Sequence, residues 1–297
     1  MIEHDNLQRF IFDNAPVRGE YIHLGESFQT IAGQHDYPPA VRQLLGEALC
    51  VAGLLTAIIK FKGRLTVQFR GKGKLKLLLA QCNNNFNVRG LVKCDDDLTY
   101  QDLMEAFNDG VLVIMLDGGS TKRNYQGVVS WRGNSLVESI EGYFRDSEQL
   151  ATKLWLSVNK NEAAGLLLQV LPGIEKSPHG LEQDIVSLHW ERLTAVTSAV
   201  SPDDMLNMSY ENLLRKLYPK EEVRIFAPQE ITFRCTCSRK RGEEAIGLLG
   251  VEEAEAELKD KQVIVVTCDF CNKEYVFDKV DVAAVFAKKG SSETHLH

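Results

Sequence analysis

Four cysteines in two close pairs constrain this chain more than any other feature of its sequence. Cys235 and Cys237 form a Cys-x-Cys pair, and Cys268 and Cys271 form a Cys-x-x-Cys pair, with residues 238–267 between them. Tetrahedral zinc prefers soft ligands, and a Cys-x-x-Cys turn presents two thiolates to one ion. A module of this size has too small a hydrophobic core to fold stably without a bound metal ion or disulfide bonds. The spacing therefore predicts one Zn²⁺ per chain, held by these four cysteines in the reduced protein.

The sequence around the two pairs predicts a small α/β module. Residues 238–249 have the pattern of a helix closed by a glycine, and 251–261 that of a second helix. Strand patterns follow over 262–267 and 274–277, which predicts a hairpin around the second cysteine pair. A last helix is expected over 278–286. The hairpin would bring the second pair of cysteines back toward the first.

The residues next to the cysteines bear on whether such a site is inert or reactive. Each cysteine has a near neighbour, so zinc loss would permit the local disulfides Cys235–Cys237 and Cys268–Cys271. Four basic residues flank the first pair with no acid among them: Arg234, Arg239, Lys240 and Arg241. Nearby cations favour the thiolate form, which is the form that oxidants attack. The residues alone leave open both an oxidant sensor and an inert structural zinc site.

Composition and charge exclude several classes of protein. The chain has 297 residues, a formal net charge of −7 and seven cysteines, an odd number that argues against a secreted disulfide framework. An acidic balance disfavours nucleic acid and anionic membrane surfaces as partners. The N-terminus lacks a signal-peptide pattern, and the longest apolar stretch, 49–59, is too short to span a bilayer. We therefore expect a cytoplasmic protein in which 49–59 belongs to a buried helix.

The distribution of secondary-structure signals, prolines and cysteines divides the chain into three parts: 1–175, 176–230 and 231–297. The first part alternates helix and strand signals and predicts an α+β core domain with a mixed, largely antiparallel sheet. Its expected elements include a short amphipathic helix over 6–12 and a long helix over 38–60. The last part holds the zinc module.

The middle part, 176–230, is cut by prolines and predicts a helical linker that is ordered only when its apolar faces dock. Four apolar residues of this linker are candidates for a surface that binds other proteins, although core packing explains them equally well. They are Trp190, Leu193, Leu213 and Leu217.

Three cysteines lie outside the two pairs. Cys50 falls in the long apolar helix and is expected to be buried and inert. Cys82 and Cys94 are close to turns rich in glycine or asparagine, which predicts more accessible thiols. These three residues are not expected to bind the metal.

The cysteine segments 233–239 and 268–271 resemble the bacterial heat-shock protein 33 family, the redox-regulated holdase chaperones. The resemblance covers nearly the whole chain and extends through 17–20, 65–69, 125–129, 143–150 and 167–172. It implies that the reduced, zinc-bound protein is inactive and that oxidants form two disulfides, Cys235–Cys237 and Cys268–Cys271. Zinc then leaves, the module and linker unfold, and the exposed surface binds unfolding or oxidatively damaged proteins without ATP. The resemblance also implies a homodimer when oxidised, and later transfer of clients to ATP-dependent chaperones.

Two other functions compete with this interpretation. A thiol–disulfide oxidoreductase could use Cys268 and Cys271, but that chemistry needs the motif at the start of a helix, whereas strand-like residues follow it here. A nucleic-acid-binding zinc module could use the basic stretch 60–76, but those charges alternate with apolar residues, as on a solvated sheet face. No common hydrolase, metalloprotease or nucleotide-binding motif occurs in the chain, so an enzyme is not expected.

Overall fold

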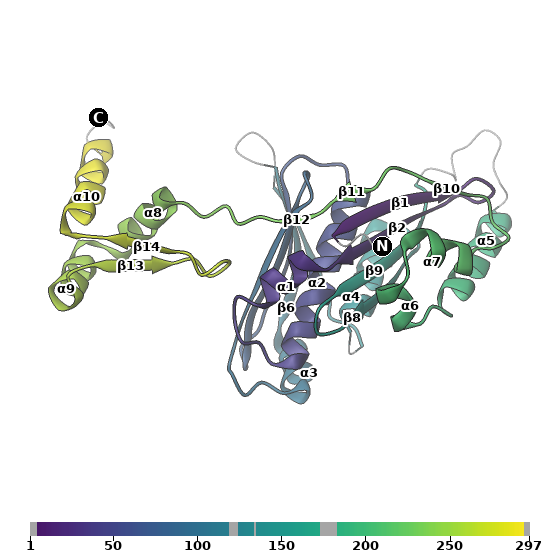
Figure 1. Ribbon diagram of the computed structural model, residues 1–297, viewed down its shortest axis with the longest axis horizontal. Helices are drawn as coiled ribbons and strands as arrows, with labels where there is room; N and C mark the ends of the chain where they lie inside the picture. Colours follow the sequence, from purple (N-terminus) through teal and green to yellow (C-terminus); the bar gives the residue numbers. More distant parts are fainter. Residues whose placement is uncertain (1–4, 119–123, 134, 173–182, 294–297) are drawn as a thin grey trace. The chain divides into compact units, whose positions relative to one another are not determined.

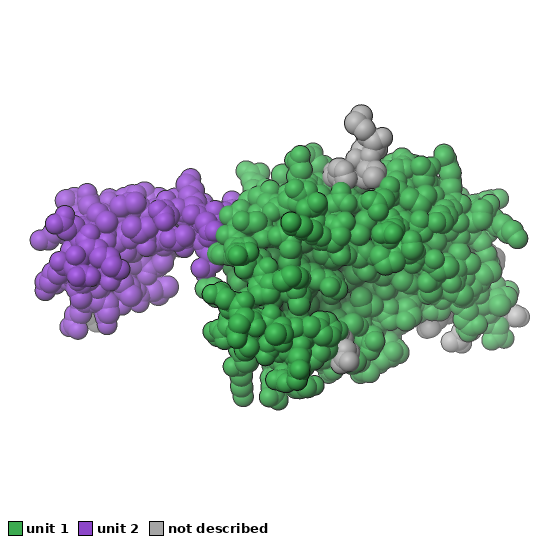
Figure 2. Space-filling view, turned by 60° about the horizontal axis from the view of Figure 1, so that its bottom comes forward, with its two compact units in different colours: residues 1–234 green, residues 235–297 purple. Residues whose placement is uncertain are grey.

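The protein forms two compact units, residues 1–234 and 235–297, which Figure 2 colours separately. The computed structural model describes residues 5–118, 124–133, 135–172 and 183–293. Its mixture of helices with two large, mostly antiparallel sheets and a small hairpin confirms the predicted α+β class. The domain boundary expected at 175/176 lies outside the described residues.

The first sheet of unit 1 is antiparallel and has the order β10-β1-β2-β9-β8, with β11 also pairing with β1. Its strands are β1 (Asn6–Phe12), β2 (Val17–Leu24), β8 (Thr152–Val158), β9 (Ala163–Val170), β10 (Val223–Ile225) and β11 (Gln229–Glu230). The helix expected over 6–12 is therefore wrong. Leu7 packs in one core, and Phe10 and Phe12 pack in another on the opposite face. A strand whose two faces are both buried has apolar residues on both faces. In β1 the spacing of these apolar residues resembles that of an amphipathic helix, which explains the wrong prediction.

The second sheet has the order β12-β5-β4-β3-β6-β7. Its strands are β3 (Arg64–Arg70), β4 (Leu75–Asn83), β5 (Asn87–Cys94), β6 (Val111–Asp117), β7 (Tyr125–Val129) and β12 (Thr232–Phe233), the last parallel to β5. Leu65, Val67 and Phe69 alternate along β3 and are all fully buried, as their period of two predicts.

The helix α2 (Pro39–Ile58) lies between the two sheets and forms the centre of the main core (Figure 1). Gly53 permits its close approach to β2, because a Cβ at this position would lie 2.3 Å from Ile22 Cδ1. By length and composition α2 could cross a membrane, but 78% of its most apolar window is buried inside the fold. The prediction of a buried helix at 49–59 is confirmed. The smaller elements of this unit are α1 (Glu26–Ala32), α3 (Tyr100–Asp109), α4 (Leu136–Tyr143) and the π-helical turn η1 (Phe144–Glu148).

Two arginines from the first sheet cap the C-terminal end of α2. Arg9 donates to the Ala57 carbonyl oxygen at 2.7 Å, and Arg18 donates to that of Ile58 at 3.2 Å. Cations at this end of a helix are favourable, because the last carbonyl groups carry partial negative charge. Glu20 is fully buried and accepts a hydrogen bond from Arg9 Nε at 2.8 Å. Burial raises the pKa of Glu20 to about 7, although both arginines favour its charged form.

The buried Glu20 predicts a distinct pH dependence of the stability of unit 1. Its pKa is 4.5 in an unfolded chain and about 7 in the fold, so the folded state binds the extra proton between these values. This contribution to the free energy of unfolding is present below pH 4.5 and is lost as the pH rises toward 7, by about 3 kcal/mol at most. We expect Glu20→Gln to flatten that decline in urea titrations followed by tryptophan fluorescence, because all three tryptophans lie in unit 1. Parallel pH profiles of wild type and variant would contradict the assignment.

Three short helices cover the face of the first sheet that points away from α2 (Figure 1). They are α5 (Gln183–Thr197), α6 (Pro202–Asn207) and α7 (Tyr210–Leu217). The side chains of Ser201 and Ser209 cap α6 and α7 by accepting hydrogen bonds from backbone N–H groups. The helices and the sheet share a second core that includes Phe10, Phe12 and Tyr218.

The segment 223–234 is attached to both sheets of unit 1. Its strands β10 and β11 pair with β1, and β12 pairs with β5. Between them Ile231 is 2% exposed and belongs to the main core. The backbone N–H of Arg234 donates to the Val88 carbonyl oxygen at 3.1 Å. The chain is thus anchored to unit 1 up to the residue before Cys235.

Unit 2 contains α8 (Arg239–Leu249), α9 (Val251–Lys261), the hairpin β13 (Ile264–Thr267) and β14 (Glu274–Phe277), and α10 (Lys279–Glu293). These are the five elements expected from the sequence, with α10 longer than predicted. The buried core among the described residues of this unit is small: Ile246, Ala254, Ile264, Phe277 and Val282. A core this small indicates that the fold of unit 2 depends on a further stabilising link, such as a bound metal ion.

Candidate metal centre

The four cysteines of the two pairs meet at one point of unit 2. Their sulfur atoms all lie within 4.8 Å of one another, and all four thiols are free. Two close contacts join the first pair to the second: Cys235 Sγ lies 3.6 Å from Cys268 Sγ, and Cys237 Sγ lies 3.5 Å from Cys271 Sγ. Tetrahedral zinc with Zn–S bonds of about 2.3 Å requires sulfur–sulfur separations of about 3.8 Å. The cluster therefore fits one tetrahedral ion.

Local structure positions each pair. Cys237 directly precedes Ser238, whose hydroxyl caps α8 by accepting from the Arg241 N–H at 3.3 Å. Cys268 follows β13, and its carbonyl oxygen accepts from the Cys271 and Asn272 N–H groups at 3.3 and 2.8 Å. This tight turn between β13 and β14 points both sulfurs of the second pair toward the first.

The thiols cannot all ionise at neutral pH without a cation. Burial, reinforced by the neighbouring thiols, raises the pKa of Cys268 and raises that of Cys271 to about 12. For Cys237, burial also opposes ionisation, but hydrogen bonds, the largest from Tyr275, outweigh it and lower the pKa to about 7. A divalent cation would stabilise the remaining thiolates, and four sulfur donors match the preferences of zinc.

One side chain of β14 contacts the cluster directly, and others from β14 and α10 contact the basic residue Arg239 that follows the first pair. The Tyr275 hydroxyl donates to Cys237 Sγ at 3.2 Å, and this bond is the main reason that the pKa of Tyr275 rises to about 12. Arg239 lies 4.4 Å from the centre of the Phe277 ring and forms an ion pair with Asp281 at 2.7 Å. The basic residues that flank the first cysteine pair have no acidic neighbour in the sequence, but Asp281 of α10 provides one in the fold. Arg241 donates to the Thr236 hydroxyl at 2.8 Å.

Tyr275 is the residue of this site that the sequence analysis missed. It had been assigned to a strand, and the period of two places it on the same face as the buried Phe277. This periodicity could have indicated that Tyr275 faces the interior of unit 2. It could not reveal the contact with Cys237, because the two residues are 38 positions apart in the sequence.

The other three cysteines lie in unit 1 and are not part of the cluster. Cys50 on α2 is fully buried, as expected from the sequence, and burial raises the pKa of its thiol. Cys82 was expected to be accessible, which is wrong. It is fully buried on β4, where it faces Thr56 of α2, and burial raises its pKa to about 12. Cys94 is half-buried, with its pKa also raised mainly by burial.

The four linker residues considered for client binding are far from the cysteines in the sequence and belong to unit 1. Leu193, Leu213 and Leu217 are buried, and Trp190 is half-buried against the same core. All four pack toward the first sheet in this conformation, so the structure brings them together as part of the second core.

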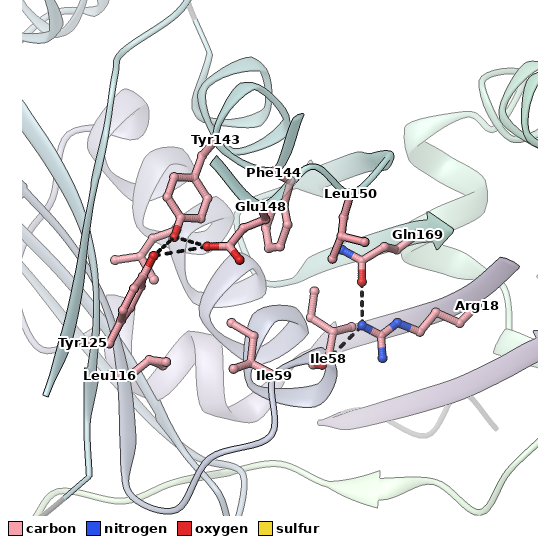
Figure 3. A pocket seen from close by; sticks show the side chains of 11 residues that line it. Arg18, Ile58, Ile59, Leu116, Tyr125, Tyr143, Phe144, Glu148, Leu150 and Gln169 are labelled. Atoms are coloured by element: carbon pink, nitrogen blue, oxygen red, sulfur yellow. Dashed lines mark hydrogen bonds between the residues drawn. The ribbon is translucent and has the colours of Figure 1, made fainter. Parts of the chain in front are cut away.

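A separate cavity of about 250 Å³ opens in unit 1 near the end of α2 (Figure 3). The wall of this cavity includes Ile58 and is largely apolar, because the cavity lies beside the main core. The hydroxyls of Tyr125 and Tyr143 donate to Glu148 at 3.1 and 2.7 Å, and Arg18 donates to Gln169 at 2.5 Å. These polar side chains hydrogen-bond to one another, and no sequence pattern predicted a site here.

An α+β domain followed by a small module in which four thiols converge defines a class of protein with a candidate site for a sulfur-ligated metal ion. The chain belongs to the Hsp33 protein family, whose family model matches residues 5–278, and this is a family of chaperones.

Proteins called "33 kDa chaperonin" are similar over nearly their whole length. The one from Nitrosococcus oceani is 40% identical over 97% of this chain and 96% of its own, and the one from Azotobacter vinelandii is 40% identical over 98% and 97%. The crystal structure of the 33 kDa chaperonin from Thermotoga maritima matches with a TM-score of 0.78 at 23% identity, covering 97% of this chain and all of that one. This structural likeness shows that the two chains share a fold.

Proposed function

We propose that this protein is an ATP-independent holdase chaperone that oxidation activates. The convergence of four free cysteines in a module with a very small core is the observation that carries the proposal. Cys235, Cys237, Cys268 and Cys271 would hold one Zn²⁺ in the reduced, inactive protein. The ion supplies the folding energy that such a core lacks, about 10–16 kcal/mol in small zinc-finger peptides.

Oxidation would remove the ligands in pairs. A thiolate attacks peroxide, the O–O bond breaks, and a sulfenic acid and hydroxide form. The neighbouring thiolate then displaces the second hydroxide and forms a disulfide. We propose the products Cys235–Cys237 and Cys268–Cys271, because partners that are close in sequence stay close as the module unfolds. Peptide mapping distinguishes them from the cross-pairs that are in contact in the folded module.

The linker would carry this change into unit 1. Two of its helices are short: α6 has six residues and α7 has eight, so they have little stability without their docking surface. Once residues 235–297 unfold, the anchored segment 223–234 loses its folded neighbour along the chain. Undocking of α5–α7 would uncover the sheet face that bears Phe10 and Phe12, an apolar surface for unfolding proteins.

Further parts of the proposal rest on the family. They are a homodimer in the oxidised state and transfer of clients to ATP-dependent chaperones. A location in the cytoplasm, with neither nucleic acid nor membrane as partner, is proposed from the acidic composition of the chain. The geometry disfavours the rival oxidoreductase, because Cys268 and Cys271 lie in a hairpin turn between β13 and β14 and not at the start of a helix.

An aggregation assay tests the proposed function. After treatment with peroxide and mild heat, the protein should suppress light scattering from a chemically unfolded test protein, equally with and without ATP. The reduced, zinc-bound protein should suppress it far less. Equal suppression by both forms would refute regulation by oxidation. Catalytic reduction of insulin by the reduced protein would instead support the oxidoreductase.

A further inference from the structure

The four sulfurs of the metal centre differ in the hydrogen-bond donors that reach them. Backbone N–H groups of Phe270 and Lys273 hydrogen-bond to Cys268 and Cys271, and such donors are present whatever the side chain. Cys237 instead receives the phenolic hydroxyl of Tyr275, at 3.2 Å. This side-chain donor can be removed by substitution without changing the backbone.

Tyr275 is held in place independently of the sulfur. It lies on β14, where its backbone pairs with Val266 of β13, and its ring packs against the small core of unit 2. The Lys273 ammonium group lies 5.4 Å from the ring centre. The hydroxyl is therefore aimed at Cys237 by a strand and a packed ring, which are retained when tyrosine is replaced by phenylalanine.

We propose that Tyr275 is a positioning residue that sets the reactivity of the site, by donating a hydrogen bond that protects the Cys237 thiolate from electrophiles and oxidants. A donor that is hydrogen-bonded to a thiolate withdraws electron density from the sulfur lone pair that attacks. The inference rests on the proposed function, because it assigns a determinant of the oxidation threshold at the same site.

The size of the effect follows from general thiol chemistry. A hydrogen bond to a charged group changes thiolate basicity by roughly one to two powers of ten. Nucleophilicity follows basicity with a Brønsted slope of about 0.4–0.5, so losing the hydroxyl should speed attack by Cys237 about three- to tenfold. The thiolates that accept backbone donors should be unaffected.

Tyr275→Phe in the full-length, zinc-loaded protein tests the proposal with N-ethylmaleimide as the probe. The sulfur forms a bond to one alkene carbon, the other alkene carbon takes a proton from water, and the thiolate is lost as a ligand. Mass spectrometry measures the labelling rate at each cysteine, and a chromogenic chelator measures zinc release. Tyr100→Phe is the matched control, because it removes a hydroxyl from a side chain of unit 1 that is 62% exposed.

The expected result is faster labelling of Cys237, by three- to tenfold, with unchanged rates at Cys268 and Cys271. Equal rates at Cys237 in variant and wild type would overturn the proposal. So would a uniform acceleration at all four cysteines, or zinc loss before the reagent is added, because either shows that the hydroxyl only maintains the fold. The assay needs no disulfide and no client, so failure of the proposed function would appear separately, as a wild type that peroxide does not activate.

Discussion

Replacing both Cys235 and Cys268 by serine should reduce the zinc content from about one ion per chain to none. It should also unfold residues 235–297 in the absence of any oxidant. The substitutions remove one ligand from each pair, and the small buried core among the described residues of this unit provides too little burial to hold it together. The loss is large because structural zinc contributes about 10–16 kcal/mol in modules of this kind.

Metal analysis and hydrogen exchange of the C-terminal amides measure this outcome. Cys94→Ser is a suitable control, because it removes a half-buried thiol outside the cluster and should leave the zinc content unchanged. A double variant with full zinc content would show that these cysteines do not form the metal site. A variant without zinc whose amides stay protected would show that the module folds without the ion.

Leu213→Ala should make the reduced, zinc-bound protein suppress aggregation without an oxidant. Leu213 is completely buried between α7 and the first sheet. Truncating a buried leucine costs about 2–5 kcal/mol, which raises the undocked population of the linker about thirtyfold or more. Light scattering measures the activity, zinc analysis confirms that the metal is retained, and fluorescence reports undocking through Trp190 on α5.

The matched control for this variant is Leu188→Ala, which truncates a leucine of the linker that is 66% exposed. It should behave as wild type. If Leu213→Ala undocks the linker, retains zinc and still does not suppress aggregation, the face covered by α5–α7 is not the client-binding surface. Leu217→Ala, also at a buried position, provides a second variant of the same design.

The parts of the fold that the sequence predicted correctly depend on local signals. The closing glycine and the periodicities of unit 2 predict α8, α9, β13 and β14 to within two residues, whereas α10 extends seven residues beyond its predicted end. The prediction failed at 6–12, because both faces of β1 are buried: Leu7 packs in the main core, and Phe10 and Phe12 pack in the second core. It failed at Cys82 because the turn nearby suggested exposure, whereas the pleat of β4 directs this side chain toward α2.

The sequence by itself determined the chemistry of this protein: four cysteines at these spacings can serve one soft cation, since ligand type and local spacing are properties of short segments. Only the tertiary structure decided which groups control that chemistry. Tyr275 reaches Cys237 across the β13–β14 hairpin, and Leu193, Leu213 and Leu217 are buried because the linker helices dock on the first sheet. The physical reason is that the reactivity of a thiol and the burial of a side chain depend on neighbouring residues that are distant in sequence. A local sequence pattern does not identify those neighbours.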